Sequence, residues 1–232
     1  MTDAVPTVSV IVPVYNGARF LAATLASVRA QTYRDFETVV VDDGSTDGSA
    51  EVAAGFGDVR VVRQANQGCA KARNEGVAAA RGGLLAFLDA DDLWTPDKLA
   101  VQTAHLAAHP AIGYSIARQE IFLEPGATRP PGLRPAHLEA DQVGYLPSTL
   151  VVRREVFVRV GGFDTSLAVA SDVEWFVRAK DLAIPMAILP QILVRRRIHR
   201  TNISSDVNRN HAALLRVFKA SIDRQRGRSG GT

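Results

Sequence analysis

The sequence predicts an α/β fold, a single domain with a mostly parallel central sheet flanked by helices. Two observations carry this prediction. Apolar, strand-like runs alternate four times with helical stretches over residues 7–108, and the runs at 36–41 and 84–88 lead directly into carboxylates. Alternation at this spacing is typical of right-handed βαβ crossovers. In open sheets of that kind, ligands bind beyond the carboxyl ends of the strands.

The elements of the first half follow from residue type. Strands are expected at 7–14, 36–41, 58–62 and 84–88, because these runs are apolar and rich in β-branched residues. Helices are expected over 19–31, 50–54 and 70–77, and from Thr95-Pro96 to about 108. The residues Ser45, Thr46 and Asp47 are candidate caps of the second helix.

The second half is less regular. Four prolines (Pro125, Pro130, Pro131, Pro135) exclude a regular element from 124–138, and we expect a loop near the ligand site. Strands are expected at 114–122 and 146–152, helices at 154–160 and 171–182, and a strand-like run broken by proline at 184–194. The single domain spans 1–224, divided into about 5–110, about 111–205 and a helix at 206–224, and residues 225–232 are expected to be a disordered basic tail.

The amino-acid composition limits the classes of partner that are expected. The 232 residues carry a formal charge of +3, without a Lys/Arg stripe interleaved with aromatics, so nucleic acid is not an expected partner. Basic residues gather at 195–197, at Arg200 and in the tail, which suits a solvated face, phosphates or peripheral contact with an anionic membrane. With one cysteine, Cys69, and neither a leader pattern nor a long apolar run, the expected location is cytoplasmic.

Five acidic residues are expected at the carboxyl edge of the sheet: Asp42, Asp43, Asp89, Asp91 and Asp92. Converging carboxylates repel one another unless a cation or hydrogen bonds hold them. Mg²⁺ or Mn²⁺ is the economical solution, because these ions prefer oxygen ligands and bridge carboxylates to diphosphates. A solvated turn that caps the next helix is the alternative. The sequence contains no G-x-G-x-x-G and no P-loop, which argues against Rossmann dehydrogenases and P-loop NTPases.

Several motifs, in this order and spacing, resemble glycosyltransferase family 2, the inverting nucleotide-sugar glycosyltransferases with a GT-A fold. The resemblance covers about residues 8–204. It rests on the segments 8–16 (VSVIVPVYN), 42–47 (DDGSTD), 66–68 (NQG) with 72–74 (ARN), 89–92 (DADD), 161–164 (GGFD), Asp172 before Glu174-Trp175, and 197–204 (RIHRTNIS).

The resemblance implies a role for each matching residue of the donor site. Pro13 and Tyr15 would line the nucleotide pocket, Asp43 would accept from a uracil or thymine N–H, and Asp42 would support that loop. Arg73 would reach toward the nucleotide or the carboxylates, while Asp89, with Ala90 beside it, would contact the ribose side. Asp91 would be the principal metal ligand, with Asp89 and Asp92 flanking it and His199 as a further ligand of metal or diphosphate.

The resemblance also implies that Asp172 is the catalytic base that removes the acceptor proton. An ordinary first-turn helix carboxylate is the alternative interpretation, because the helix dipole favours Asp there. Many relatives carry Glu before this aspartate, whereas this chain has Ser171, so recognition of the donor sugar or the acceptor is expected to differ.

The predicted function is therefore metal-assisted glycosyl transfer, with inversion, from a UDP- or dTDP-sugar to a saccharide, lipid-linked or small-molecule acceptor. Two alternatives stay open. A catalytically silent sugar-nucleotide-binding or scaffold protein would share the fold. A sugar nucleotidyltransferase fits less well, because residues 12–16 lack a glycine-rich phosphate loop. The sequence leaves the donor sugar, the acceptor and the oligomeric state open.

Overall fold

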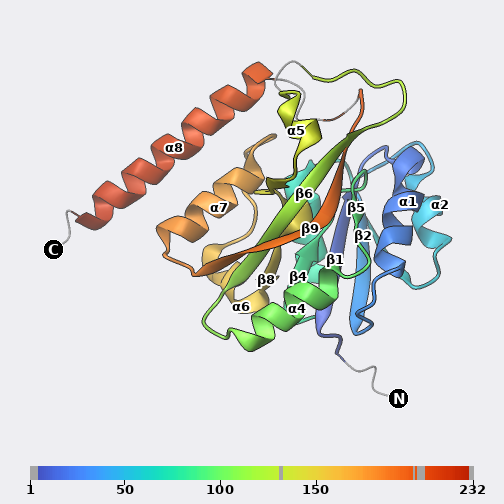
Figure 1. The fold of residues 1–232 in the computed structure, drawn as a ribbon, viewed down its shortest axis with the longest axis horizontal. Coiled ribbons are helices and arrows are strands. Elements are labelled where there is room, and N and C mark those ends of the chain that lie inside the picture. The colour runs from blue at the N-terminus through green and yellow to red at the C-terminus, as the bar shows by residue number, and fades with distance from the viewer. Residues whose placement is uncertain (1–4, 131–132, 201, 203–206, 230–232) are drawn as a thin grey trace.

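A computed structural model describes residues 5–130, 133–200, 202 and 207–229. The chain forms a nine-stranded sheet with the strand order β3-β2-β1-β4-β8-β6-β9-β5, and β7 pairs with β6 beside this path. Helices cover both faces of the sheet (Figure 1). The predicted α/β class and the predicted GT-A-type layering are therefore confirmed.

The first half of the sheet is parallel. It contains β1 (Val8–Val14), β2 (Phe36–Asp42), β3 (Val59–Arg63) and β4 (Leu84–Phe87). Val8 pairs in register with Phe36 on one side and with Leu84 on the other. Because these strands run the same way in a matched register, the loops after β1, β2 and β4 emerge at one edge.

Three helices connect these strands: α1 (Ala18–Arg29), α2 (Ser49–Ala54) and α3 (Cys69–Ala79). Asp47 joins the starts of two of them, since its carboxylate accepts from Ala18 N and from Ser49 N and Oγ. The fourth helix, α4 (Lys98–Ala108), begins later than expected. Residues 93–94 form the short strand β5 (Leu93–Trp94), and the Thr95 hydroxyl bonds the Asp97 side chain instead of capping a helix at Pro96.

The second half of the sheet is mixed. β8 (Val151–Arg153) runs antiparallel to both β4 and β6 (Tyr114–Leu123), whereas β6 and β9 (Met186–Ile198) are parallel. The expected strand at 146–152 is wrong in its first part, where η1 (Pro147–Thr149) forms a turn that buries two hydroxyl side chains. The expected break at 184–194 is also wrong: β9 is continuous, and a register shift after Ala117 accommodates Pro190 without a ladder donor.

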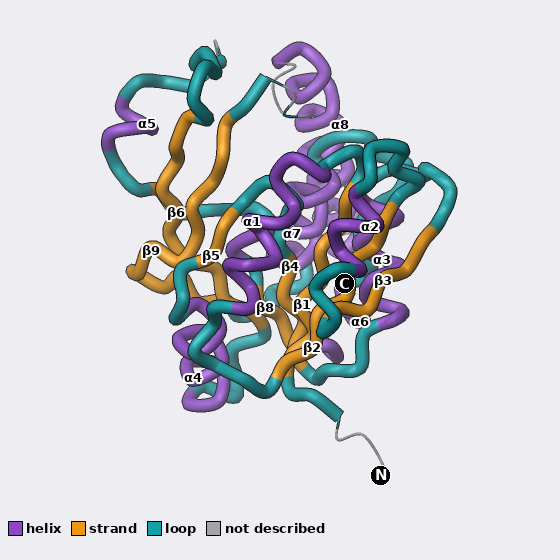
Figure 2. Tube along the Cα trace, turned by 90° about the vertical axis from the view of Figure 1, so that its right-hand side faces the viewer, coloured by secondary structure: helices purple, strands orange, loops and turns teal. Residues whose placement is uncertain are grey.

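The remaining elements are short or helical. They are α5 (Ala136–Glu139), β7 (Gln142–Val143), α6 (Arg154–Val160) and α7 (Ser171–Asp181). The tube view separates the long β6–β9 pair, with α5 beyond it, from the parallel strands (Figure 2). The proline-rich segment is thus a loop with one helical turn inside it, among the residues that the structure describes.

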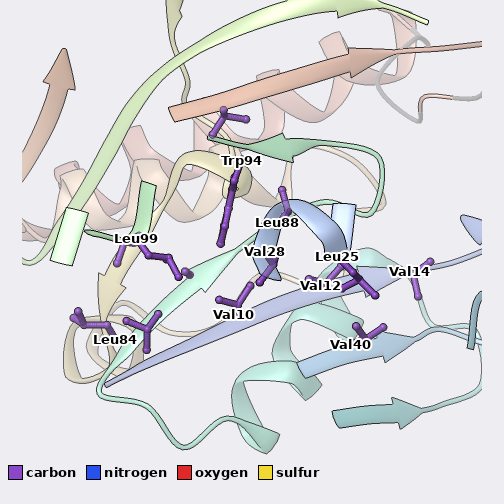
Figure 3. Close-up of a cluster of buried hydrophobic side chains, with 14 of the residues drawn as sticks. Val10, Val12, Val14, Leu25, Val28, Val40, Leu84, Leu88, Trp94 and Leu99 are labelled. Atoms are coloured by element: carbon purple, nitrogen blue, oxygen red, sulfur yellow. The ribbon is translucent and has the colours of Figure 1, made fainter. Parts of the chain in front are cut away.

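Two apolar cores lie on opposite faces of the sheet. On one face, alternate residues of β1 pack against α1 and α4, as Val10, Val12 and Leu25 show in Figure 3. On the other face, Ile11 and Phe87 pack with Trp175 of α7 and Phe157 of α6. Burial on both faces explains why the β1 sequence is almost continuously apolar instead of alternating.

The chain ends in the longest helix, α8 (Val207–Ser229), which lies along the outer side of α7 (Figure 1). The expected helix ended at 224, and the observed one continues to Ser229, so a tail that starts at 225 is wrong for 225–229. Residue 206 and residues 230–232 lie outside the described residues. None of the described helices combines the length and apolar character needed to cross a membrane.

Candidate functional site

The site lies where β1, β2 and β4 end. Four loops meet there, and they follow β1, β2, β3 and β4 in the chain. Three contacts tie the loops after β1 and β2 together: Asn16 N donates to Ser45 Oγ at 2.9 Å, Asn16 Oδ1 accepts from Thr46 N at 2.8 Å, and Asp43 N donates to Val14 O at 2.8 Å. The parallel sheet therefore brings the predicted residues of the donor half to a single edge.

Asp43 organises the loop before α3. Its Oδ1 accepts from Gln64 Nε2 at 2.6 Å and from Gln67 N at 2.8 Å, and its Oδ2 accepts from Gly68 N at 2.8 Å. The carboxylate is buried, and these donors hold both of its oxygens. A contact between Asp43 and a nucleobase stays a prediction, and in the described geometry its side chain shapes the wall of the site.

The other predicted nucleotide contacts differ in exposure. Asp42 is buried, and its Oδ1 accepts from Ser45 N at 3.0 Å, as expected of a residue that supports the loop. Pro13 is buried within β1, whereas the Tyr15 ring is 53% exposed just beyond the strand. Tyr15 therefore presents an open aromatic face, and Pro13 acts through the backbone course of β1.

Asp89 and Arg73 form a partly buried ion pair. Arg73 Nη2 lies 2.6 Å from Asp89 Oδ1, and its guanidinium sits 5.4 Å from the Phe163 ring centroid. Burial acts to lower the pKa of Arg73, but the charges of Asp89 and Asp172 more than offset it and raise that pKa. Arg73 is therefore a fixed cation that feels carboxylates from both halves of the chain.

Cys69 opens α3 beside this pair. Burial is the largest cause that raises the pKa of its thiol to about 12, with the charges of Asp89, Asp172 and Asp91 adding to it and Arg73 opposing it. The thiol is thus neutral near pH 7 and is not poised as a nucleophile.

Asp91 connects the strand edge to the end of β9. Its Oδ2 lies 2.9 Å from His199 Nε2 and 3.0 Å from Asn202 Nδ2. The His199 ring packs on Phe20 of α1 with centroids 4.5 Å apart. Of the motif at 197–204, Thr201, Ile203 and Ser204 lie outside the described residues. The structure brings Asp91 and His199 together across the chain, and the role of both as ligands stays a prediction.

Asp92 points into the protein. It is 3% exposed, and its carboxylate accepts from Arg197 N at 3.0 Å and from Ser148 Oγ at 2.7 Å. Burial, followed by the charges of Asp91 and Asp89, raises the pKa of Asp92 well above its usual range. Ala90, between the flanking acids, is held by its carbonyl, which accepts from Thr24 Oγ1 at 2.8 Å. Asp92 thus orders the loop that presents Asp89 and Asp91.

Asp172 lies in the first turn of α7. The helix begins after Ala170, which adopts left-handed backbone angles (φ 62°), and Ser171 is buried. Asp172 Oδ1 accepts from Val173 N at 2.9 Å. Because the charge of Asp172 acts on both Arg73 and Cys69, the fold brings the predicted base to the carboxylate edge.

Arg197 and Glu124 are site residues that no sequence prediction named as functional. Arg197 Nε donates to the Asp91 carbonyl at 3.0 Å, its Nη1 pairs with Glu124, and its guanidinium sits 4.9 Å from the Phe20 centroid. The hydrogen bond from Arg197 is the largest cause that lowers the pKa of Glu124. The 197–204 motif is the only signal in the sequence for Arg197, and Glu124 becomes visible only through the β6–β9 pairing.

A cavity of about 300 Å³ opens beside His199, lined by Arg19, Glu124, Pro125, Gly126, Ala127, His199 and Arg200. Its walls carry two guanidinium groups and one carboxylate. The root of the proline-rich loop forms part of the lining. That this loop lies near a bound ligand stays a prediction.

This edge offers only a few protein ligands for the expected divalent cation. The described residues contain no group of three or more His, Cys, Asp or Glu side chains arranged to hold a metal. They do offer Asp91 Oδ1 and Asp89 Oδ2, half-buried oxygens to which no described residue donates a hydrogen bond. Mg²⁺ is commonly held by one or two carboxylates, with substrate phosphates supplying further ligands. This donor set suits such a cation.

Comparison with known proteins identifies the family of this chain. Similar proteins include an uncharacterized glycosyltransferase of Nostoc sp., 50% identical over 40% of this chain and 30% of its own length. An uncharacterized glycosyltransferase of Rickettsia typhi is 29% identical over 95% of this chain and 74% of its own length. The chain therefore spans less than a third of the first relative and about three quarters of the second.

Solved structures share the fold at low identity. The mannosyltransferase PcManGT of Pyrobaculum calidifontis, in complex with GDP-Man and Mn²⁺, superposes with a TM-score of 0.73 at 23% identity, covering 95% of this chain and 65% of that one. TarS of S. aureus in complex with UDP-GlcNAc gives 0.71 at 22% identity, covering 87% and 61%. A sequence profile described as Glycosyl transferase family 2 matches residues 9–164, from β1 past α6. The chain belongs to glycosyl transferase family 2.

Proposed function

We propose that this chain transfers a glycosyl group, with inversion, from a nucleoside-diphosphate sugar to an acceptor hydroxyl. The observation that carries the proposal is the meeting of the Arg73–Asp89 pair and the Asp91–His199 pair at one sheet edge. Asp172, in the first turn of α7, is near enough for its charge to raise the pKa of Arg73. In this proposal Asp91 is the carboxylate that holds the cation and Asp172 is the base.

The donor would bind along the ends of β1, β2 and β4. Tyr15 supplies an exposed ring for a base, and the loop that Asp43 holds is the second element that we expect to contact the nucleotide. The two neighbouring structures were solved with UDP-GlcNAc and with GDP-Man. A uracil or thymine nucleotide follows from the family pattern at Asp43 and is the donor we propose for this chain.

The chemistry follows from the placement of charge. Asp172 accepts the acceptor's hydroxyl proton while that oxygen attacks the anomeric carbon, and the bond from this carbon to the diphosphate oxygen breaks on the opposite side. Arg73 keeps its positive charge throughout, which stabilises negative charge that develops on the donor. A bound Mg²⁺ or Mn²⁺, held by Asp91 with Asp89 and His199, would neutralise the leaving diphosphate.

Arg19 and Arg200 extend this positive environment into the cavity beside His199. Asp92 contributes indirectly in this scheme, because Arg197 N and Ser148 Oγ already hold its carboxylate. We therefore expect Asp92 to fix the loop, whereas Asp91 carries the direct contact with the cation.

A catalytically silent sugar-nucleotide-binding protein is the competing function. The partly buried Arg73–Asp89 pair would serve it equally well, because that pair needs no acceptor. Asp172 favours an enzyme, since a binding protein has no use for a carboxylate beside the pair. The location in the cytoplasm and the class of acceptor stay predictions.

The first experiment identifies the donor. The purified chain is incubated with a panel of UDP-, dTDP- and GDP-sugars, with Mn²⁺, with Mg²⁺ or with chelator, and nucleoside diphosphate release is followed by mass spectrometry. Metal-dependent hydrolysis of one donor is expected. Binding without hydrolysis or transfer, across a panel of saccharide and lipid-linked acceptors, would favour the silent protein.

The second experiment tests the metal-binding role. Calorimetry with UDP and Mn²⁺ is expected to show at least about tenfold weaker binding for Asp91→Asn, because one of few protein oxygen ligands is replaced by an amide. Asp97→Asn makes the same substitution at an exposed aspartate just before α4, and it is the matched control. Equal affinity of the Asp91 variant and the parent, in both metal and chelator, would contradict the metal site.

A further inference from the structure

The exposed side of α8 carries three large apolar residues on one face. Leu215 is 72% exposed, Phe218 52% and Ile222 49%. Their spacing of three and four residues places them side by side on a helix. Exposed apolar side chains are ordinary when scattered, but a row along a single helix face is typical of an interaction surface.

The opposite side of the same helix is already occupied. Val217 is 2% exposed, Ala213 and Ser221 are each 9% exposed, and Asp181 of α7 accepts from Ser221 Oγ at 2.8 Å. Asp181 also pairs with Arg224 Nε at 2.9 Å. The contact with α7 therefore fixes how α8 is rotated, and this rotation turns Leu215, Phe218 and Ile222 away from the protein.

Positive charge borders this apolar row. Lys219 and Arg226 follow Leu215 and Ile222 by four residues and so lie along the same side of the helix. By sequence, α8 holds a single acidic residue, Asp223, and six basic residues: Arg209, Arg216, Lys219, Arg224, Arg226 and Arg228. An apolar row flanked by Lys and Arg is typical of helices that lie in the plane of a membrane interface.

We propose that α8 docks this protein onto the surface of an anionic lipid bilayer. Leu215, Phe218 and Ile222 enter the boundary between headgroups and acyl chains, while Lys219 and Arg226 contact anionic headgroups. Each basic residue near such a surface contributes favourably, and shallow burial of the apolar row adds to it. This inference is independent of the donor, and it would hold for an enzyme or a silent protein.

The charge also argues against a second copy as the occupant. Two α8 helices packed face to face would bring Lys219 and Arg226 of both copies together, and like charges across an interface oppose association. An anionic surface relieves this repulsion instead.

Vesicle binding tests the proposal with the full chain. Phosphatidylcholine vesicles with and without about 30% phosphatidylglycerol are sedimented with the protein at low and high salt. We expect binding to the anionic vesicles alone, weakened by salt. The variant Leu215→Ser/Phe218→Ser/Ile222→Ser and the variant Lys219→Glu/Arg226→Glu are each expected to bind at least about tenfold more weakly.

The matched control lies on α6, where Val158 is 70% exposed beside the exposed Arg159. Val158→Ser/Arg159→Glu removes an apolar residue and reverses a charge elsewhere on the surface, and binding is expected to be unchanged. Circular dichroism of every variant checks that the fold is retained. Equal loss in the control would show general electrostatic attraction and overturn the role of α8.

A spectroscopic reporter gives an independent measurement. Both native tryptophans, Trp94 and Trp175, are buried, so the indole introduced by Phe218→Trp is the exposed one. Its emission is expected to shift to the blue with anionic vesicles and to stay unshifted with neutral ones. No shift, or a concentration-dependent dimer that Leu215→Ser/Phe218→Ser/Ile222→Ser abolishes, would overturn the proposal and assign the face to self-association.

Discussion

The two halves of the sheet place their functional residues by different means. In the parallel half, the sheet edge itself presents Asp42, Asp43 and Asp89, because the strands before them are in register. In the mixed half, individual long-range contacts hold the candidate site residues in place. Asp91 meets His199 across 108 residues, and Asp92 accepts from Arg197 N across 105. In the first half, the ends of the strands determine where the candidate site residues lie. In the second half, contacts that form only in the folded chain determine it.

The largest expected effect tests the proposed base, Asp172, which belongs to the mixed half. Asp172→Asn should lower kcat by about 10²- to 10⁴-fold, because general base catalysis contributes that much, while donor affinity stays within about twofold. Stopped assays of transfer and calorimetry of the donor measure the two quantities.

Glu155→Gln is the control for Asp172, since Glu155 is also a first-turn acid, on α6, and is exposed. A similar loss of kcat in both variants would reduce Asp172 to a helix-dipole residue. Unchanged kcat in Asp172→Asn would remove it as the base.

The next effect probes the parallel scaffold. A Cβ at Gly82 would lie 2.6 Å from Ser9 N in β1, whereas one at Gly83 would meet nothing within 4 Å. Gly82→Ala should therefore destabilise the protein by about 1–3 kcal/mol, and Gly83→Ala by much less. Urea unfolding of both variants measures the difference. Equal midpoints would show that the backbone before β4 shifts to accommodate the added methyl group and would contradict the prediction.

Lys98 sits where α4 meets β5, between the two halves. It is fully buried, no described residue bonds its Nζ, and this nitrogen lies 4.1 Å from the Trp94 ring centroid. Burial lowers the pKa of Lys98 well below its usual 10.5. Lys98→Met should raise the free energy of unfolding at pH 7 by about 1–2 kcal/mol, since an unpaired buried amine is costly.

The pH dependence of stability, compared between the parent and Lys98→Met, tests the direction of this pKa shift. Between the lowered folded pKa and the unfolded value near 10.5, the unfolded chain binds more protons, so stability of the parent rises with pH across this window. The variant should lack that rise. Denaturation at pH 7 and pH 9.5 measures it, with the exposed lysine variant Lys180→Met as control. A parallel rise in both proteins would contradict a lowered pKa of Lys98.

The smallest effect concerns the attachment of α8. Burial opposes ionisation of Asp181, but hydrogen bonds from Gln225, Ser221 and Arg224 outweigh it and lower the pKa of Asp181. The contribution of ionised Asp181 to the free energy of unfolding is thus fully present above pH 3.8, the usual pKa of this group. It is lost as the pH falls through the lowered pKa of the folded protein. Asp181→Asn should speed amide exchange over α8 several-fold at neutral pH, whereas Asp223→Asn should not. Equal exchange would mean that apolar contacts alone hold α8.

The comparison also explains what the sequence can predict. The apolar runs of β1, β2 and β4 and the stripe of α1 predict the donor half almost to the residue, because local pattern and register coincide there. The bulge after Ala117 and the hydroxyl-lined turn at Ser148 depend on β8, β6 and β9 meeting. No local pattern indicates such pairings, so Glu124 and Ser148 emerge only from the folded structure. Motif order indicates Asp91, His199 and the segment that begins at Arg197, but not the contacts that Arg197 makes.

The proline-rich loop is pinned at both ends. At one end, Glu124 N donates to Ile198 O at 2.9 Å and its carboxylate pairs with Arg19 and Arg197; at the other, Gly144 N donates to Ala117 O at 3.1 Å. The stretch between these anchors is the part of the chain that we expect to tolerate exchange. Because Ala127 lines the cavity beside His199 and Asp141 pairs with Arg118 of β6, we expect changes confined to 128–140 to leave the sheet and the donor edge in place. A library over 128–140 therefore tests whether this loop sets the acceptor preference.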